Sequence, residues 1–316
     1  MTNDGIKHKL KERAQFEGFS LMRICRPWSL KEHSKRLREF LNKNRHGEML
    51  WMNQKVEWRS DPSSLWPNAQ SCVMLGESYS PKHDPLEILK KPELDNHKYT
   101  SGKVLIIAGS KGMTGAAILS TSAALRSGAG LTITTTPSSL NYIYETNLIE
   151  GITLSLRDED RGYLDISHYD SIMEKVEWAD SVLVGPGLGR NKSTQLLIKK
   201  LVESITKPLI LDADGLFPYS NSLNELSKRH TPLIITPHFG EFSRLINIAV
   251  EDIISNFPTI MEDTLKVFNH TLLIKQAPIC ILKSNKAIVN ITGNPGLATA
   301  GTGDILSGIL ASFLSS

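Results

Sequence analysis

The spacing of apolar residues predicts short strands alternating with helices over residues 101–316. Apolar runs of mostly four to six residues recur there, and Gly, Pro, Asp or Ser bounds most of them. Such runs predict buried strands, and apolar residues at helical spacing predict helices. The predicted strands are 104–108, 131–136, 181–184, 208–211, 233–235 and 279–282. The predicted helices are 115–127, 194–205, 241–249 and 305–314.

This alternation predicts an α/β fold. Its central sheet is expected to be mainly parallel, with helices covering both faces. In such sheets, ligands bind at the carboxyl ends of the strands. The turns that directly follow the predicted strands are therefore the places to look for chemistry.

The first 90 residues differ from the rest of the chain in amino-acid composition. They hold four of the five tryptophans and are rich in Arg, Lys and His. Residues 29–41 have apolar side chains near helical spacing, and Ser29 with Glu32 would make a capping box. Residues 72–75 form a candidate strand. We predict a small α+β segment at 1–88, a proline-containing linker at 89–100, and the α/β domain at 101–316.

Composition and charge narrow the function classes. Hydrophobic residues are 40% and charged residues 22%, and the net charge is +3, which gives no reason to expect a nucleic-acid partner. The three cysteines are far apart with no CxxC, against a disulfide framework or a cysteine metal site. No run approaches the ~20 apolar residues of a membrane helix, and the N-terminus is polar. We expect a cytoplasmic protein without a membrane partner.

Two glycine-rich turns follow predicted strands. The turn at 109–117 opens a helix, and glycines with free helix N-terminal amides let a ligand approach the backbone. It lacks the GK[ST] of a Walker loop, and a plain strand–helix junction would look similar. The turn at 185–189 has three glycines in five positions. It would suit a flat ligand, or it is a tight loop.

Acidic and imidazole side chains follow two further strands. Asp212 and Asp214 come at the end of a predicted strand, where they would attract a metal, fix a neighbouring loop or cap a helix. His238 lies just past another strand end, where it is either structural or functional. Glu241, three residues later, suits the start of a helix.

The turn before the last predicted helix carries the strongest chemical signal. Gly301, Thr302 and Gly303 place amide groups at a helix N-terminus, which makes an anion hole. Asp304 follows in the first turn. A carboxylate beside such a hole suits phosphoryl transfer to a hydroxyl, since it takes the proton while the amides hold the phosphoryl charge. The other interpretation is a helix cap.

Seven motifs occur in this order along the chain: HKY at 97–99, GS…TGAA at 109–117, LRSGAG at 125–130, GPGLG at 185–189, LDADGL at 211–216, TPHFGEF at 236–242 and GNPGLATAGTGD at 293–304. Together they resemble the ADP/ATP-dependent NAD(P)H-hydrate dehydratase family. The resemblance covers about residues 92–316 and implies a ribokinase-like fold.

The resemblance implies repair of hydrated nicotinamide cofactors. In that reaction ADP, or ATP, with Mg²⁺ phosphorylates the ring hydroxyl of (S)-NAD(P)H hydrate, and phosphate loss restores NAD(P)H. ADP, which would yield AMP, is favoured over ATP by the bacterial-looking N-terminal segment. The implied base is Asp304, with Gly301, Thr302 and Gly303 as its anion hole. The implied substrate contacts are Ala116, Gly187, His238 and Asp304. The implied nucleotide contacts are Lys283, Ser284, Asn285, Lys286, Ala287 and Gly303.

Two departures from the family pattern stand out. The family usually has Lys-Gly where this chain has Lys283-Ser284, and a serine would crowd that loop if the position needs a positive φ. The family also continues for tens of residues past Ser316. Without them we expect exposed apolar surface at Leu310, Phe313 and Leu314. Family members commonly form tetramers, so a homo-oligomer is expected.

Residues 1–88 resemble the start of epoxyqueuosine reductase. The similar stretches are 46–52, 59–62, 65–67 and 71–76. The cluster cysteines of that enzyme are absent, so no reductase activity is assigned, and the segment is either a docking appendage or a remnant of a gene fusion. Two alternatives to the repair enzyme remain: another ribokinase-like small-molecule kinase, and an inactive chimera.

Overall fold

The chain divides into two compact units, Met1–Lys91 and Pro92–Ser316. The computed structural model describes residues 3–16, 19, 21–26, 31–43, 56–57, 64, 67–68, 70–76, 98, 100–276, 279–283, 286–290 and 298–315. The division falls inside the predicted linker. Most of the linker lies outside the described residues, so the predicted bounds 1–88, 89–100 and 101–316 stay a prediction.

The N-terminal unit contains a two-stranded sheet and two helices. Its elements are α1 (Asn3–Phe16), β1 (Leu21–Cys25), α2 (Lys31–Asn42) and β2 (Cys72–Gly76). The strands are antiparallel, with Leu21 opposite Gly76 and Cys25 opposite Cys72. The predicted helix at 29–41 and strand at 72–75 correspond to α2 and β2. Ser29 of the predicted capping box lies outside the described residues.

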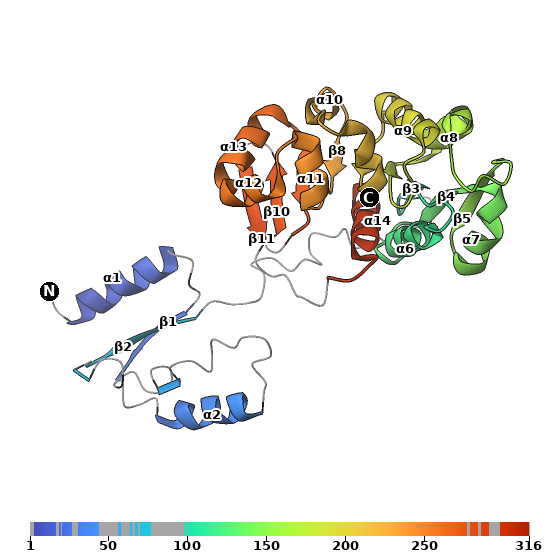
Figure 1. Ribbon diagram of the computed structural model, residues 1–316. Helices are drawn as coiled ribbons and strands as arrows, with labels where there is room; N and C mark the ends of the chain where they lie inside the picture. The colour runs from blue at the N-terminus through green and yellow to red at the C-terminus, as the bar shows by residue number, and fades with distance from the viewer. Residues whose placement is uncertain are drawn as a thin grey trace. The chain divides into compact units, whose positions relative to one another are not determined.

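The C-terminal unit is built on a sheet of nine strands in the order β11-β10-β9-β8-β7-β6-β3-β4-β5 (Figure 1). Every neighbouring pair from β9 to β5 is parallel, and β10 and β11 add an antiparallel hairpin at one edge. The strands are β3 (Lys103–Ile107), β4 (Leu131–Pro137), β5 (Ile152–Leu156), β6 (Ser181–Val184), β7 (Leu209–Leu211), β8 (Leu233–Ile235), β9 (Thr271–Ile274), β10 (Ile279–Lys283) and β11 (Lys286–Asn290). The mainly parallel sheet is confirmed.

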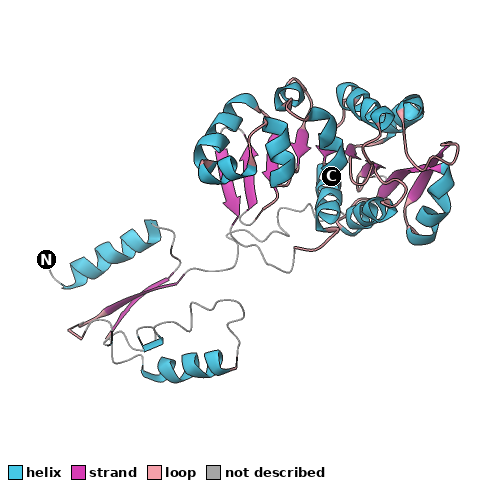
Figure 2. Cartoon of the chain, viewed as in Figure 1, coloured by secondary structure: helices cyan, strands magenta, loops and turns pink. Residues whose placement is uncertain are grey.

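Helices cover both faces of this sheet, because its strands are apolar on both sides (Figure 2). One face packs against α6 (Thr114–Arg126), α7 (Asn141–Asn147) and α14 (Thr302–Ser315). The other packs against α8 (Tyr169–Trp178), α9 (Lys192–Ser204), η5 (Ala213–Tyr219), α10 (Leu223–Ser227), α11 (Phe239–Ile246), α12 (Val250–Ser255) and α13 (Phe257–Val267). Two short 3₁₀ turns, η3 (Ser138–Leu140) and η4 (Ile166–His168), complete the unit.

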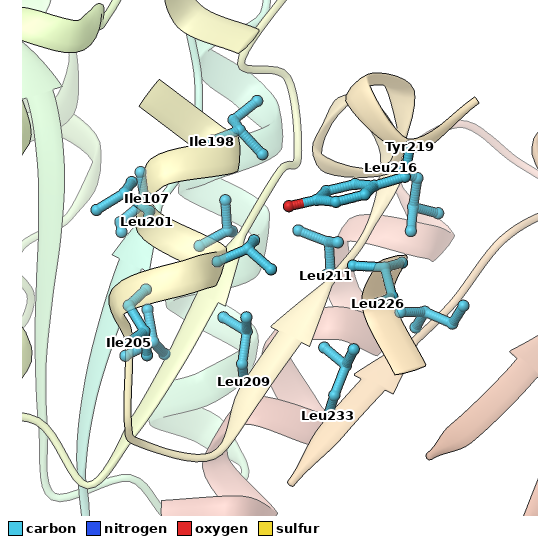
Figure 3. Close-up of a cluster of buried hydrophobic side chains, with 14 of the residues drawn as sticks. Ile107, Ile198, Leu201, Ile205, Leu209, Leu211, Leu216, Tyr219, Leu226 and Leu233 are labelled. Atoms are coloured by element: carbon cyan, nitrogen blue, oxygen red, sulfur yellow. The ribbon is translucent and has the colours of Figure 1, made fainter. Parts of the chain in front are cut away.

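Alternating side chains of the central strands β3, β6 and β7 pack into the two cores. Leu105, Leu209 and Leu211 point into the larger core, part of which Figure 3 shows, whereas Val104 and Ile106 point into the smaller one. All five side chains are buried. This packing holds the carboxyl ends of the parallel strands along one edge of the sheet.

Candidate active site

Two glycine-rich turns are joined at the carboxyl ends of β3 and β6. The Gly109 amide donates to the Pro186 carbonyl at 2.7 Å, and Ser110 Oγ donates to the Gly187 carbonyl at 2.8 Å. Gly187 has φ +63°, and a Cβ there would stand 2.9 Å from Ala116 Cβ. The two residues are therefore in close approach, and the structure brings these two predicted substrate contacts together.

Asp214 fixes the second of these turns. Its carboxylate accepts from the Gly189 amide at 3.0 Å and from Arg190 Nε at 3.2 Å. Of the roles considered for the Asp212–Asp214 pair, fixing a neighbouring loop is thus confirmed for Asp214. The Asp212 side chain makes no capping hydrogen bond to η5, which it precedes.

Asp212 is instead paired with a lysine that the sequence reasoning missed. Lys275 Nζ lies 2.7 Å from Asp212 Oδ1, and the Asp212 side chain is 1% exposed. Lys275 directly follows β9, and its amide donates to the Pro237 carbonyl at 2.8 Å. A β-bridge pairs it with His238. The apolar run at 271–274 was the signal that would have predicted β9 and placed Lys275 at the carboxyl edge.

Asp304 lies in the first turn of α14, next to this ion pair. Gly301 precedes the helix with φ +86°, a conformation that favours glycine. The Thr302 amide donates to the Thr299 carbonyl at 3.4 Å. That amide is therefore engaged within the turn. The amides of Gly303 and Asp304 are first-turn groups without intrahelical acceptors, which leaves them for a ligand.

The charge of Asp304 depends on its neighbours. Burial and the nearby Asp212 carboxylate raise the pKa of Asp304 above its ordinary value, and the Lys275 cation partly offsets them. A Cβ on Gly303 would stand 3.3 Å from Lys275 Nζ, so the lysine also reaches the predicted anion hole. One cation, two carboxylates and a helix N-terminus thus share one end of the sheet.

His238 and Glu241 form a capping box at the start of α11. His238 Nδ1 accepts from the Gly240 amide at 3.0 Å, while Glu241 accepts from the His238 amide at 2.9 Å. With Nδ1 accepting, the ring proton sits on Nε2, 3.2 Å from Glu241 Oε1. The structural interpretation of both residues holds, and the His238 ring remains 55% exposed at the same edge.

The predicted nucleotide contacts at 283–287 lie elsewhere. Strand β10 runs antiparallel to β9, with Cys280 opposite Ile274 and Leu282 opposite Leu272. This direction carries Lys283 towards the amino end of β9, away from Lys275. Lys286, which lies opposite Lys283, and Ala287 begin β11 at the same end of the sheet. Lys283, Lys286 and Ala287 are all exposed. The structure does not bring them to Asp304. Ser284, Asn285 and residues 291–297 lie outside the described residues.

In the described part of the chain, no group of three or more His, Cys, Asp or Glu side chains is arranged to hold a metal ion. No helix in the same part has the length and hydropathy needed to cross a membrane.

The fold and the site define a ribokinase-like α/β protein. A ribokinase-like superfamily protein from Enterococcus faecalis V583 superposes with a TM-score of 0.60 and 28% identity, covering 71% of this chain and 75% of that one. The ADP/ATP-dependent NAD(P)H-hydrate dehydratase from Bacillus subtilis, co-crystallized with ATP/Mg²⁺, gives a TM-score of 0.56 and 27% identity, covering 72% and 77%.

The chain belongs to the NAD(P)H-hydrate dehydratase family, whose model matches residues 104–316. The bifunctional NAD(P)H-hydrate repair enzyme Nnr of Moorella thermoacetica is 36% identical over 224 residues, which are 71% of this chain and 42% of that protein. The Nnr of Escherichia coli is 34% identical over 227 residues. The chain thus spans about two fifths of the length of these relatives. The family match lies within the C-terminal unit and does not bear on the resemblance of residues 1–88 to epoxyqueuosine reductase.

Proposed function

We propose that this chain catalyses the ADP- or ATP-dependent dehydration of NAD(P)H hydrate to NAD(P)H. The observation that carries the proposal is the Asp304 carboxylate at the N-terminus of α14, beside the Lys275–Asp212 ion pair. Family membership supports the substrate class, and the position of the site at the carboxyl edge agrees with where α/β sheets bind ligands.

Each group has one chemical task in this proposal. Asp304 accepts the proton of the ring hydroxyl as the hydroxyl oxygen bonds to the terminal phosphorus of the nucleotide. The raised pKa of Asp304 makes it a better proton acceptor than an ordinary aspartate. Phosphate then leaves with the electron pair of the C–O bond as the ring nitrogen donates its lone pair to that carbon. Loss of a proton from the adjacent ring carbon to solvent then forms the carbon–carbon double bond of NAD(P)H and returns the lone pair to the nitrogen. ADP would leave as AMP.

The transferring phosphoryl group is assigned to the N-terminus of α14. The amides of Gly303 and Asp304 would hold its oxygens, and the Lys275 ammonium would offset its charge. We propose this assignment in place of the expected nucleotide contacts at 283–287, because Lys283, Lys286 and Ala287 lie towards the amino ends of the parallel strands, opposite Asp304.

Mg²⁺ fits the same place. Mg²⁺ is commonly held by one or two carboxylates together with substrate phosphates, and the Asp212 carboxylate is close enough to Asp304 to raise the pKa of Asp304. When bound, the metal would neutralise phosphate charge. The nicotinamide end is assigned to Ala116, Gly187 and the exposed His238 ring, at the neighbouring strand ends.

The rest of the chain completes the proposal. The N-terminal unit is a docking appendage or fusion remnant derived from an epoxyqueuosine reductase start, with no reductase activity of its own. The protein works in the cytoplasm as a homo-oligomer. The free thiols of Cys25, Cys72 and Cys280 suit a reducing compartment.

A direct assay tests the function. The full chain is mixed with chemically hydrated NADH or NADPH, Mg²⁺ and either ADP or ATP, and recovery of NAD(P)H absorbance is followed. We expect recovery with a nucleotide and none without it. Phosphorylation of simple hydroxymethyl compounds by ATP, with no recovery from either hydrate, would contradict the proposal and identify a small-molecule kinase.

A further inference from the structure

The sheet of the N-terminal unit brings two cysteines together. Strands β1 and β2 lie side by side and run antiparallel (Figure 1). Cys25 is the last residue of β1, Cys72 is the first residue of β2, and the register places the two directly opposite each other. Both are free thiols in the structure. Because they are far apart in the sequence, only the pairing of the strands makes them neighbours.

This register meets the backbone requirement for a disulfide bond. Side chains of directly opposed residues in an antiparallel pair lie on the same face of the sheet. Their Cα atoms are about 4.5 or 5.5 Å apart, depending on the type of pair. Disulfides join residues whose Cα atoms are roughly 4.4–6.8 Å apart, so either type of pair allows the bond.

The face of the sheet that carries the two cysteines is open to solvent. Side chains alternate between the faces of a strand, so Arg23 shares a face with Cys25, and Met74 shares one with Cys72. Arg23 and Met74 are both exposed, and the two cysteines are half-buried. Met22, on the other face, is 8% exposed. A small reagent in solution can therefore reach both thiols.

The third cysteine has a different environment. Cys280 is 2% exposed, and its neighbours across the strands are Ile274 and Val289. Burial raises the pKa of the Cys280 thiol, which keeps the thiol protonated. Because the thiolate is the reactive form of cysteine, Cys280 is expected to stay unreacted and serves as an internal control.

A bond between Cys25 and Cys72 would fasten a unit with a small core. Among the described residues of this unit, the buried apolar side chains are those of Ala14, Met22 and Leu41. A two-stranded sheet is marginally stable by itself, and small units with little core gain most from a cross-link. The cysteine pair is at the end of the sheet where the chain leaves β1 and returns into β2. The bond would close the loop from residue 25 to residue 72 and restrict the unfolded chain.

We propose that Cys25 and Cys72 form a reversible redox site, which a small-molecule disulfide such as oxidised glutathione converts into an intramolecular disulfide. One cysteine thiolate attacks a sulfur of the small disulfide, whose S–S bond breaks as one glutathione thiolate leaves. The other cysteine thiolate then attacks the protein sulfur of this mixed disulfide and displaces the second glutathione thiolate. The two cysteines thus lose two electrons and two protons, and two molecules of reduced glutathione carry them away.

The dithiol is the resting form of this site in a reducing compartment. Disulfides formed there are usually transient and report a change in the redox state of the surroundings. The bond would join β1 to β2 within the N-terminal unit. The inference does not rest on the function proposed for the C-terminal unit.

Oxidised glutathione is the probe for this site. The reduced full chain is incubated in glutathione buffers of increasing oxidised-to-reduced ratio, quenched with acid, denatured and alkylated, and its peptides are analysed by mass spectrometry. We expect a peptide pair linked through Cys25 and Cys72, with Cys280 alkylated. Alkylated Cys25 and Cys72 at every ratio, or cross-links between two chains in place of the internal bond, would overturn the inference.

Single substitutions test whether each thiol is within reach of the other. Cys25→Ser and Cys72→Ser each leave one thiol with no partner to displace glutathione, so a glutathione adduct should accumulate on the remaining cysteine. The wild type and Cys280→Ser, the matched control, should form the internal disulfide instead. Equal adduct levels in the wild type and the two single variants would show that the thiols do not meet.

Hydrogen exchange of the full chain tests the effect on stability. In the oxidised chain, the amides of β1 and β2 should exchange roughly tenfold or more slowly than in the reduced chain, and dithiothreitol should reverse the change. The amides of β6, in the C-terminal unit, are the reference and should exchange equally in both forms. Unchanged exchange of β1 and β2 in a fully cross-linked chain would contradict the fastening of the sheet.

Discussion

Lys275→Met tests the ion pair at the centre of the proposed site. The substitution keeps most of the side-chain volume but leaves the Asp212 carboxylate, 1% exposed, without its cation. Removing one partner of a buried pair costs about 3–5 kcal/mol. Because the Lys275 side chain is itself 20% exposed, we expect the lower end, about 3 kcal/mol. For a domain of this size that lowers Tm by roughly 6–12 °C.

The assay is thermal and urea unfolding of the variant beside a matched control. Lys266→Met breaks the pair with Asp263, which has a similar distance of 2.8 Å, but there the side chains are 70% and 65% exposed. That control should lose no more than about 1 kcal/mol. Adding Asp212→Asn to Lys275→Met should restore part of the lost stability. If Lys275→Met loses no more than the control, the buried pair does not have the assigned role.

The same variant has a catalytic consequence. Lys275 lowers the pKa of Asp304 against the effects of burial and Asp212. Without the lysine that pKa rises further, so the acid limb of the kcat/KM profile should move to higher pH. An unmoved limb together with normal folding would show that the lysine does not act on Asp304.

Three further predictions concern stability. Gly308→Ala should lower the free energy of unfolding by about 2–3 kcal/mol, measured in urea, since its Cβ would stand 2.2 Å from the Ser120 carbonyl oxygen. Gly115→Ala is the control, because a Cβ there meets open space, and it should be neutral or stabilising. Equal effects of the two substitutions would contradict the close packing at Gly308. The raised pKa of Asp304 favours its protonated form in the folded state, so its ionisation destabilises the fold as pH rises from 3.8 through the folded pKa. Asp304→Asn should thus be more stable than wild type at pH 7, with the gap closing below pH 3.8 in melts at several pH values, and a gap of opposite sign would refute this. Burial opposes ionisation of Asp158, but hydrogen bonds from neighbouring hydroxyls and amides lower its pKa from 3.8 to about 2. Asp158→Asn should therefore lower the free energy of unfolding by about 2 kcal/mol at neutral pH and by little at pH 2. A loss of stability that does not depend on pH would exclude the ionised carboxylate as its cause.

Much of the fold was predictable because buried strands carry a local signal. The runs at 104–108, 131–136 and 181–184 appear as strands within about one residue of the predicted bounds. Strand β11 was not predictable in this way, since all its residues are exposed and it lacks a buried face. Strand β5 was missed for a similar reason, since only one of its five residues is buried.

The site was predictable only where its residues sit in turns with unusual composition. The glycine turns and Asp304 stand out in the sequence, and topology brings them to one edge. Lys275 does not lie in a turn of unusual composition. Its role depends on pairing with Asp212, 63 residues earlier in the chain, which the local sequence does not reveal. The distance of Lys283, Lys286 and Ala287 from Asp304 was not predictable, because the reversal of β10 depends on hydrogen bonding between strands, which no local pattern reveals.

The most direct test of the account is the activity of Asp304→Asn. Its rate of NADH recovery from the hydrate, with saturating ADP and Mg²⁺, is compared with wild type and with Asp263→Asn, a neutralised carboxylate on an exposed helix face. The account predicts a loss of about 10²–10⁴-fold for Asp304→Asn, with ADP still raising its Tm, and wild-type activity for the control. Full activity in a folded, ADP-binding Asp304→Asn variant would contradict it.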